Sequence, residues 1–392
     1  MTDRLAINPV PTDERLTGLD GMRGLAALAV FGVHFNQIAE VDTTIGPVDF
    51  YLFFANGEYG VALFFLLSGL LLSQPFWKSI FYQTTWPGLQ IYFIRRLARI
   101  LPAYYFSLTL LILITGYWKY SEAWPDILLH YSFLFNYTEF SFFSINAPFW
   151  TLAIEVQFYF LLPCIFLALR RLAPYQAFIM LFCMSLTAYF LHFGLVSTID
   201  ETILWPLNPV LTWIRPYGAV ITHSLLAHLP HFLIGIMTGG LLLHLRTRNP
   251  TRFPVGSWVY DAIFWLSLSL LLLCLSTEAT DWVQIPHGRY GLPVVSLLLG
   301  ALLVSAPLSH SANRLLESIL LRPVGVLSYG IYIYHLPILG LVDKTMGEYG
   351  FDAGENWIYL VLISLPLTLL AATLSYMVVE RPIQRFAHRR RD

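Results

Sequence analysis

The sequence predicts an all-α polytopic membrane protein with about ten transmembrane helices and one short interfacial or re-entrant segment. The 392 residues are 57% hydrophobic and only 12% charged, and the mean hydropathy is +0.63. These values lie outside the range of ordinary soluble domains. Apolar stretches of about 20 residues, the length that crosses a bilayer as a helix, recur along the whole chain.

Ten stretches have the length and composition of transmembrane helices. In chain order they cover about 21–39, 58–76, 97–117, 150–169, 176–196, 225–246, 258–276, 289–306, 324–342 and 357–379. Residues 124–137 are too short to span and are predicted to form the interfacial or re-entrant segment. We therefore expect one membrane domain over residues 1–392, in which tails at 1–20 and 380–392 flank a helical bundle at 21–379.

The basic residues are distributed unevenly between the two sides of this topology. If the N-terminus is cytoplasmic, all but four of the 23 basic residues fall on the cytoplasmic side. The exceptions are Lys119, Arg215, Arg289 and Lys344. By the positive-inside rule, both termini are expected in the cytoplasm, with the chain in the inner membrane. Membrane lipid is the expected surroundings, and no nucleic-acid partner is expected.

Three ionisable side chains occur at similar predicted depth in three different spans. Arg23 begins the first span and His34 follows it by eleven residues, so the two share one helix face, roughly 16 Å apart. The positions of His34, Glu155 and His335 in their spans place all three in the outer half of the bilayer. Ionisable groups are costly inside a membrane, so their convergence favours acid–base chemistry. For any one of them alone, polar contact between helices is the alternative.

Two further residues could contribute to such chemistry. In the ninth span, Ser328, Tyr332 and His335 follow i, i+4, i+7 spacing and form a polar stripe that must face protein or water. In the second span, Ser68 could be a nucleophile if His34 served as its base. A helix-packing role for Ser68 and the adjacent glycine is an equal alternative.

Arg95, Arg96 and Arg99 lie where the third span begins, at the predicted cytoplasmic surface. Guanidinium groups bind phosphate well, and Arg23 would join this patch. Ordinary positive-inside topology is the alternative for these residues.

A group of histidines could suggest a metal site. His223, His228 and His231 are spaced i, i+5, i+8, which does not place three imidazoles on one helical face, and Pro230 interrupts the segment. No metal site is therefore predicted.

Six segments follow one another along the chain and carry most of these residues. They read LDGMRGLAALAVFGVHF, YGVALFFLLSGLLLS, RRLARILPAYY, FWTLAIEVQFYFLLP, SYGIYIYHLP and VVERP. Together, over nearly the whole chain, they resemble the acyltransferase 3 family of integral-membrane acyltransferases. The resemblance implies that His34 is catalytic, that Arg23 is required, and that Arg96 and Arg99 help to hold an acyl-CoA donor.

The resemblance also implies an activity. Members of that family move an acyl group, most often acetyl, to a hydroxyl of an extracytoplasmic carbohydrate, lipid-linked glycan or small molecule. We therefore expect transfer from cytoplasmic acyl-CoA, with no permanently bound cofactor, to a carbohydrate or glycolipid. His34 would be the general base, Glu155 would orient it, and His335 or Tyr332 would donate to the oxyanion. An acyl-enzyme on Ser68 or His34 is a second route.

The chain departs from the family pattern in three respects. Ala62 stands where Asp is common, and Val156 stands where a second acidic residue is common, which leaves Glu155 alone. The hydrolase-like domain fused to some members is missing, so the chain is expected to act alone or with a separate periplasmic partner. The rival interpretation is a proton-coupled transporter or flippase, with Arg23, His34 and Glu155 as its relay.

Overall fold

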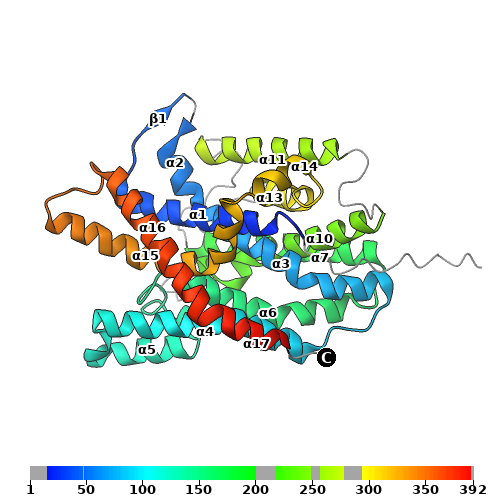
Figure 1. Cartoon of the computed structure of the whole chain (residues 1–392). Helices are drawn as coiled ribbons and strands as arrows, with labels where there is room; N and C mark the ends of the chain where they lie inside the picture. The colour runs from blue at the N-terminus through cyan, green and yellow to red at the C-terminus, as the bar shows by residue number, and fades with distance from the viewer. Residues whose placement is uncertain (1–15, 47, 200–217, 249–256, 278–293, 390–392) are drawn as a thin grey trace, which may run out of the picture.

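The computed structural model describes residues 16–389 apart from 47, 200–217, 249–256 and 278–293, and these residues are almost entirely helical (Figure 1). The helices are α1 (Leu19–Ala39), α2 (Phe50–Ala55), α3 (Tyr59–Tyr82), α4 (Leu89–Thr115), α5 (Trp124–Tyr131), α6 (Phe149–Leu169), α7 (Pro174–Ile199), α9 (Gly218–Thr222), α10 (Leu225–Arg248), α11 (Trp258–Ser276), α13 (Val294–Ser305), α14 (His310–Leu316), α15 (Leu321–Glu348), α16 (Trp357–Ser375) and α17 (Arg381–Arg389). A π-helical turn, Tyr376–Glu380, joins α16 to α17. Two short strands, β1 (Thr44–Ile45) and β2 (Val48–Asp49), pair antiparallel. The all-α class predicted from the sequence is confirmed.

Within the described residues, eight helices are long and apolar enough to cross a membrane. A ninth is counted if α13 and α14, which meet at 96°, form one broken span. The helix α1 has the length of a span, but Asp20, Arg23 and His34 make it too polar to be counted. A helix therefore lies at each of the ten predicted spans, although residues 289–293 of the eighth, like Arg215 and Arg289, lie outside the described residues.

The first and last helices show how the chain enters and leaves the bundle. Figure 1 shows that α1 begins and α17 ends at the same end of the molecule, as expected for an even number of crossings. The tail predicted at 1–20 falls largely outside the described residues, whereas most of the tail predicted at 380–392 forms α17, which ends at Arg389.

The short segment predicted between the third and fourth spans contains α5, which lies along α4 (Figure 1). The hydroxyl of Tyr104 on α4 donates to the carbonyl of His130 on α5, at 2.9 Å. One face of α5 is buried through Asp126 and His130, whereas Trp124 and Leu128 on the other face are exposed. This amphipathic helix of 8 residues is too short to span.

Asp126 anchors α5 to its surroundings. Its carboxylate lies 3.1 Å from Nδ1 of His130 and accepts a hydrogen bond from the hydroxyl of Tyr117 at 2.9 Å. Burial alone would raise the pKa of Asp126, but hydrogen bonds from His130, Ser144 and Tyr117 outweigh burial and hold that pKa below its ordinary value. Burial, followed by the hydrogen bond to Asp126, raises the pKa of Tyr117 to about 12, so this phenol stays a donor at neutral pH.

Two pairs of helices pack so closely that backbone meets backbone. A Cβ atom at Gly325 of α15 would collide with the carbonyl of Asp20 on α1, and one at Gly69 of α3 would collide with the carbonyl of Phe232 on α10. Because lipid provides no hydrophobic force between helices, close van der Waals contact of this kind is a main source of helix association. Glycine at these two positions therefore sets how closely the helices bring their polar side chains together.

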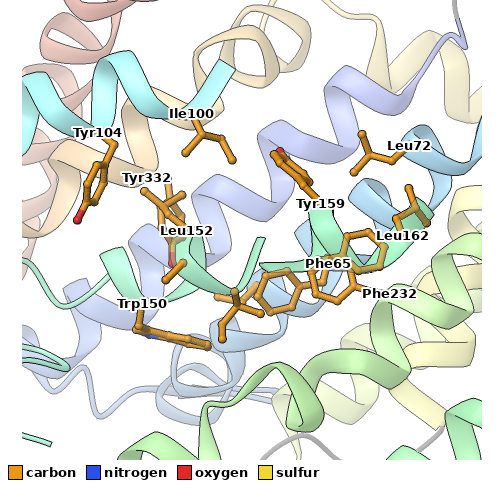
Figure 2. Close-up of a cluster of buried hydrophobic side chains, with 14 of the residues drawn as sticks. Phe65, Leu72, Ile100, Tyr104, Trp150, Leu152, Tyr159, Leu162, Phe232 and Tyr332 are labelled. Carbon is orange, nitrogen blue, oxygen red and sulfur yellow. The ribbon is translucent and has the colours of Figure 1, made fainter. Parts of the chain in front are cut away.

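The bundle is filled by an aromatic core. Phe232 stacks on Phe158 of α6 with ring centroids 3.8 Å apart, and it packs against Phe65 of α3 at 4.6 Å. Figure 2 shows Phe65 and Phe232 in this cluster, together with Tyr159 of α6 and Tyr332 of α15. The two tyrosines also line the polar cavity described next.

Candidate active site

His34 of α1 and His335 of α15 are in direct contact. Nδ1 of His34 lies 3.1 Å from Nε2 of His335, and the two rings meet edge to face with centroids 4.9 Å apart. His335 is fully buried, whereas His34 is partly exposed. The structure thus brings together two of the three groups that were expected to converge.

The hydrogen bonds of this pair assign its protons. Nδ1 of His335 lies 3.1 Å from the carbonyl of Ile331, and Nδ1 of His34 lies 3.0 Å from the carbonyl of Val30. A carbonyl only accepts, so both Nδ1 atoms carry hydrogen. The N–H of His34 is then shared between Val30 and the lone pair of Nε2 on His335. Nε2 of His34 is left with a free lone pair, which is the form that a general base requires.

Glu155 belongs to a different group, and the expectation that it orients His34 is corrected. Among the described residues, Oε1 of Glu155 accepts hydrogen bonds from the hydroxyls of Ser68 at 2.7 Å and Tyr159 at 2.8 Å. The reason lies in the packing, because α6 packs on α3, α4 and α10 rather than on α1. Ser68 likewise donates to Glu155 rather than to His34, so the pairing needed for a Ser68 nucleophile with His34 as its base is not seen.

A cavity of about 60 Å³ lies beside Glu155. Its polar lining consists of Arg23, Ser68, Arg96, Arg99, Thr151, Glu155, Tyr159, Ser328, Tyr329 and Tyr332. A single water needs roughly 10–15 Å³, so the cavity holds a few waters or a small acyl group. It is far smaller than the roughly 300–1,000 Å³ of a site for a large ligand.

Three arginines gather at this cavity from two helices. Arg23 lies 3.3 Å from the carboxylate of Asp20, and the charges of Arg99, Glu155 and Arg96 also act on it. Nε of Arg96 is buried and has no hydrogen-bond partner within the described part of the chain. Arg95 does not line the cavity, since it precedes Arg96 by one residue and points about 100° away around α4.

Tyr332 connects the cavity to the histidine pair. Its ring centroid lies 5.9 Å from that of His335, while its hydroxyl lies 2.7 Å from Oγ1 of Thr151. The hydroxyl donates to the carbonyl of Pro148 at 3.1 Å. A role for Tyr332 as oxyanion donor therefore requires that this bond be broken. His335 cannot fill that role in the observed state either, because its only N–H points to Ile331.

Asn146 is a positioning residue that the sequence analysis missed. Its Nδ2 donates to the carbonyl of Ile333 at 3.0 Å. Pro337, four residues later, has no N–H to donate to that carbonyl, so the side chain of Asn146 replaces the missing helical hydrogen bond. A proline inside a span that carries a catalytic candidate is a sequence signal that some donor is needed there, but it does not say which one.

Glu380 is a second residue without an assigned role in the sequence analysis, although it lies in the VVERP segment. The π-helical turn Tyr376–Glu380 places its carboxylate in the interior, only 3% exposed, where the charge of Arg99 acts on it. It also exerts its charge on Tyr329, another residue of the cavity lining. Single π-helical turns are frequent at functional sites. Glu380 is thus a buried acidic group close enough to Arg99 for the two to interact.

The histidines at 223, 228 and 231 lie elsewhere. Nδ1 of His231 lies 2.8 Å from Oγ of Ser296, and the ring of His223 packs edge to face on Trp150 with centroids 4.8 Å apart. Within the described ranges, no group of three or more His, Cys, Asp or Glu residues could hold a metal ion.

Comparison with known proteins adds to this geometry. A family model described as an acyltransferase domain matches residues 16–377. The chain is similar to peptidoglycan O-acetyltransferase OatA of Listeria monocytogenes, with 25% identity over 94% of this chain and 55% of the relative. It is also similar to O-acetyltransferase OatA of Staphylococcus aureus, with 25% identity over 94% of this chain and 57% of the relative. The chain therefore spans about half the length of these curated relatives. No solved structure matches it.

Proposed function

We propose that this chain, which belongs to the acyltransferase family whose model matches residues 16–377, transfers an acyl group to a carbohydrate. The acyl group, most simply acetyl, comes from cytoplasmic acyl-CoA and passes to a hydroxyl of an extracytoplasmic carbohydrate or glycolipid. The chain works in the inner membrane with both termini in the cytoplasm. The observation that carries the proposal is the contact between His34 and His335, which leaves one imidazole nitrogen of His34 unprotonated within a membrane bundle.

His34 is the general base of this reaction. Its Nε2 takes the proton of the acceptor hydroxyl as the oxygen attacks the acyl carbon. The new bond joins that oxygen to the acyl carbon, the thioester C–S bond breaks, and the proton passes to the departing CoA thiolate. His335 accepts from Nδ1 of His34 throughout, so it fixes the ring and stabilises the imidazolium that forms. This is the part first assigned to Glu155.

The arginines bind the donor. Arg23, Arg96 and Arg99 form a cationic wall, and the buried Nε of Arg96 is available to an anionic oxygen. Guanidinium groups are well suited to the phosphates of CoA. Arg23 and His34 lie roughly 16 Å apart along α1, a separation that the thioester arm would cover. A cavity of about 60 Å³ admits an acetyl group but not this arm, so donor binding must widen it.

Glu155, Ser68 and Tyr159 line the same cavity as the three arginines and are joined by hydrogen bonds. The carboxylate balances part of the arginine charge while the donor is absent. Both observed donors bind the same oxygen of Glu155, Oε1.

The test uses the purified protein in sealed vesicles. Labelled acetyl-CoA is supplied on the face where α1 begins, and peptidoglycan glycan strands on the other face, since one relative is named for that acceptor. We expect ester-linked label on the glycan, and a loss of roughly 10²–10⁴-fold with His34→Ala. The matched control is His388→Ala, at an exposed histidine of α17.

Three results would contradict the proposal. Full acyl transfer by His34→Ala would show that His34 is not the general base. Uptake of a glycan driven by a proton gradient, without consumption of acetyl-CoA, would favour the transporter. Free acetate without glycan ester would show donor cleavage alone and would contradict the choice of acceptor.

A further inference from the structure

A second, much larger depression lies on the side of the bundle, between α4, α15 and α16. It has a volume of about 820 Å³, within the range of ligand sites, and its lining is mainly apolar. Side chains on its rim such as Ile114, Leu341 and Val378 are 72%, 61% and 70% exposed, so the groove opens towards the lipid that surrounds the bundle.

The groove faces away from the histidine pair. Two of its lining residues, Pro337 and Lys344, follow His335 by two and nine positions on α15. At 100° per residue, they lie about 160° and 180° around the helix from His335. Whatever fills the groove therefore lies on the opposite side of α15 from His34, and it is not the acceptor in the reaction.

Two cations mark one end of the groove. Lys344 lines it directly, and Lys119 lies one turn beyond Thr115, which also lines it. The side chain of Lys119 folds back over Gly116, next to Thr115. In the predicted topology these are two of only four basic residues outside the cytoplasm, and both are exposed. Trp118 and Tyr120 beside them are 44% and 58% exposed, as is typical of side chains at the level of lipid headgroups.

We propose that this groove is a binding site for one anionic phospholipid of the outer leaflet. Its acyl chains lie between α4, α15 and α16, and its phosphate lies at Lys344 and Lys119. The charge of the two lysines selects an anionic headgroup, and the apolar length of the groove holds the chains. From Tyr334 to Lys344 the groove follows α15 for about 15 Å, which is the depth of one leaflet.

The chain offers a matched pair of variants to test this site. A Cβ at Gly340, which lines the groove, would meet nothing within 4 Å, and the same holds for Gly347, two turns further along α15 and not part of the lining. Gly340→Trp therefore fills the groove without disturbing the core. Gly347→Trp adds the same bulk outside it. Lys344→Gln and Lys119→Gln change exposed side chains and leave the packing intact.

The experiment measures lipid retention, and so its outcome does not depend on acyl transfer. Delipidated protein is mixed with equal amounts of phosphatidylglycerol and phosphatidylethanolamine, and bound lipid is counted by native mass spectrometry. We expect one phosphatidylglycerol on the wild type and on Gly347→Trp, and loss of it from Gly340→Trp. Each Lys→Gln change should weaken retention by about fivefold. Thermal unfolding of each variant checks that it is folded.

Three results would overturn the proposal. They are equal retention of the two lipids by the wild type, unchanged retention by Gly340→Trp and both lysine variants, and recovery from native membranes of a prenyl phosphate in place of a phospholipid. If Gly340→Trp fails to fold, the lysine variants alone decide whether an anionic headgroup is bound.

Discussion

The side chain of Asn146 supplies the hydrogen bond that Pro337 cannot make. Nδ2 of Asn146 lies 3.0 Å from the carbonyl of Ile333, which is four residues before Pro337 in α15. Asn146 comes from the loop before α6, and the next residues of that loop include Pro148, which accepts from Tyr332. One loop thus fixes both the broken turn of α15 and the tyrosine beside His335.

Replacing Asn146 by Leu should destabilise the protein by roughly 1–3 kcal/mol, because a buried carbonyl would lose its donor. Thermal or denaturant unfolding in detergent measures the change. In a Pro337→Ala background the backbone N–H of residue 337 is restored, so the same Asn146→Leu change should cost at least about 1 kcal/mol less. Equal costs in the two backgrounds would show that Asn146 does not stand in for the missing helical donor.

His335 should contribute to kcat through the lone pair of its Nε2, which accepts the hydrogen bond from His34. His335→Leu removes the acceptor for Nδ1 of His34 and should lower kcat roughly 10²-fold, with little change in the KM for the donor. His335→Gln keeps an acceptor close to the position of Nε2, and so it should recover part of that loss. Steady-state kinetics of both variants give the comparison. A His335→Gln variant no better than His335→Leu would argue that the imidazole acts in another way.

Replacing the carboxyl group of Glu380 should affect binding of the donor. Glu380→Gln is nearly isosteric and leaves Arg99 without its buried acidic neighbour, so we expect a several-fold change in the KM for acetyl-CoA and a smaller change in kcat. Glu380→Asp should restore the wild-type value in part. The control is Glu348→Gln, at an exposed carboxylate on α15. Equal effects on the KM values of donor and acceptor would indicate a general structural role.

Asp126 should make stability depend on acid pH. The pKa of this carboxyl is lower in the folded protein than in the unfolded chain, so its contribution is fully present above an unfolded value of about 4. That contribution is lost as the pH falls through the folded pKa. Asp126→Asn should therefore be less stable than wild type at pH 7, and the difference should shrink below about pH 4. Unfolding curves from pH 3 to pH 7 test this, and a constant difference would exclude ionisation of Asp126 as its cause.

Composition and residue spacing were sufficient to predict the fold class and several residues of the candidate site. A bilayer requires long apolar helices, so each predicted span coincides with a helix. His34 and His335 were correctly placed at one depth, since a rise of 1.5 Å per residue translates sequence position into height.

The same reasoning could not find which residues face one another. Depth leaves the rotation and lateral order of the helices open, and Glu155 lies on a helix that packs on α3 and α4 rather than on α1. The sequence grouped Arg95 with Arg96 and Arg99, but Arg95 does not line the cavity, because adjacent residues on a helix point about 100° apart. Asn146 lies in a loop, whose conformation cannot be predicted from hydrophobic periodicity. The burial of Glu380 depends on a π-helical turn that the sequence pattern does not predict.

The glycine contact between Gly325 and Asp20 has a mechanical consequence. With no side chain between their backbones, α1 and α15 can shift only as one stiff body, which carries Arg23, His34, Tyr332 and His335. Arg96 and Arg99 sit on α4, and Glu155 sits on α6, outside that body. The remaining walls of the cavity belong to α3, α4 and α6, so widening it for a donor while the spacing of the two imidazoles is preserved requires these helices to move.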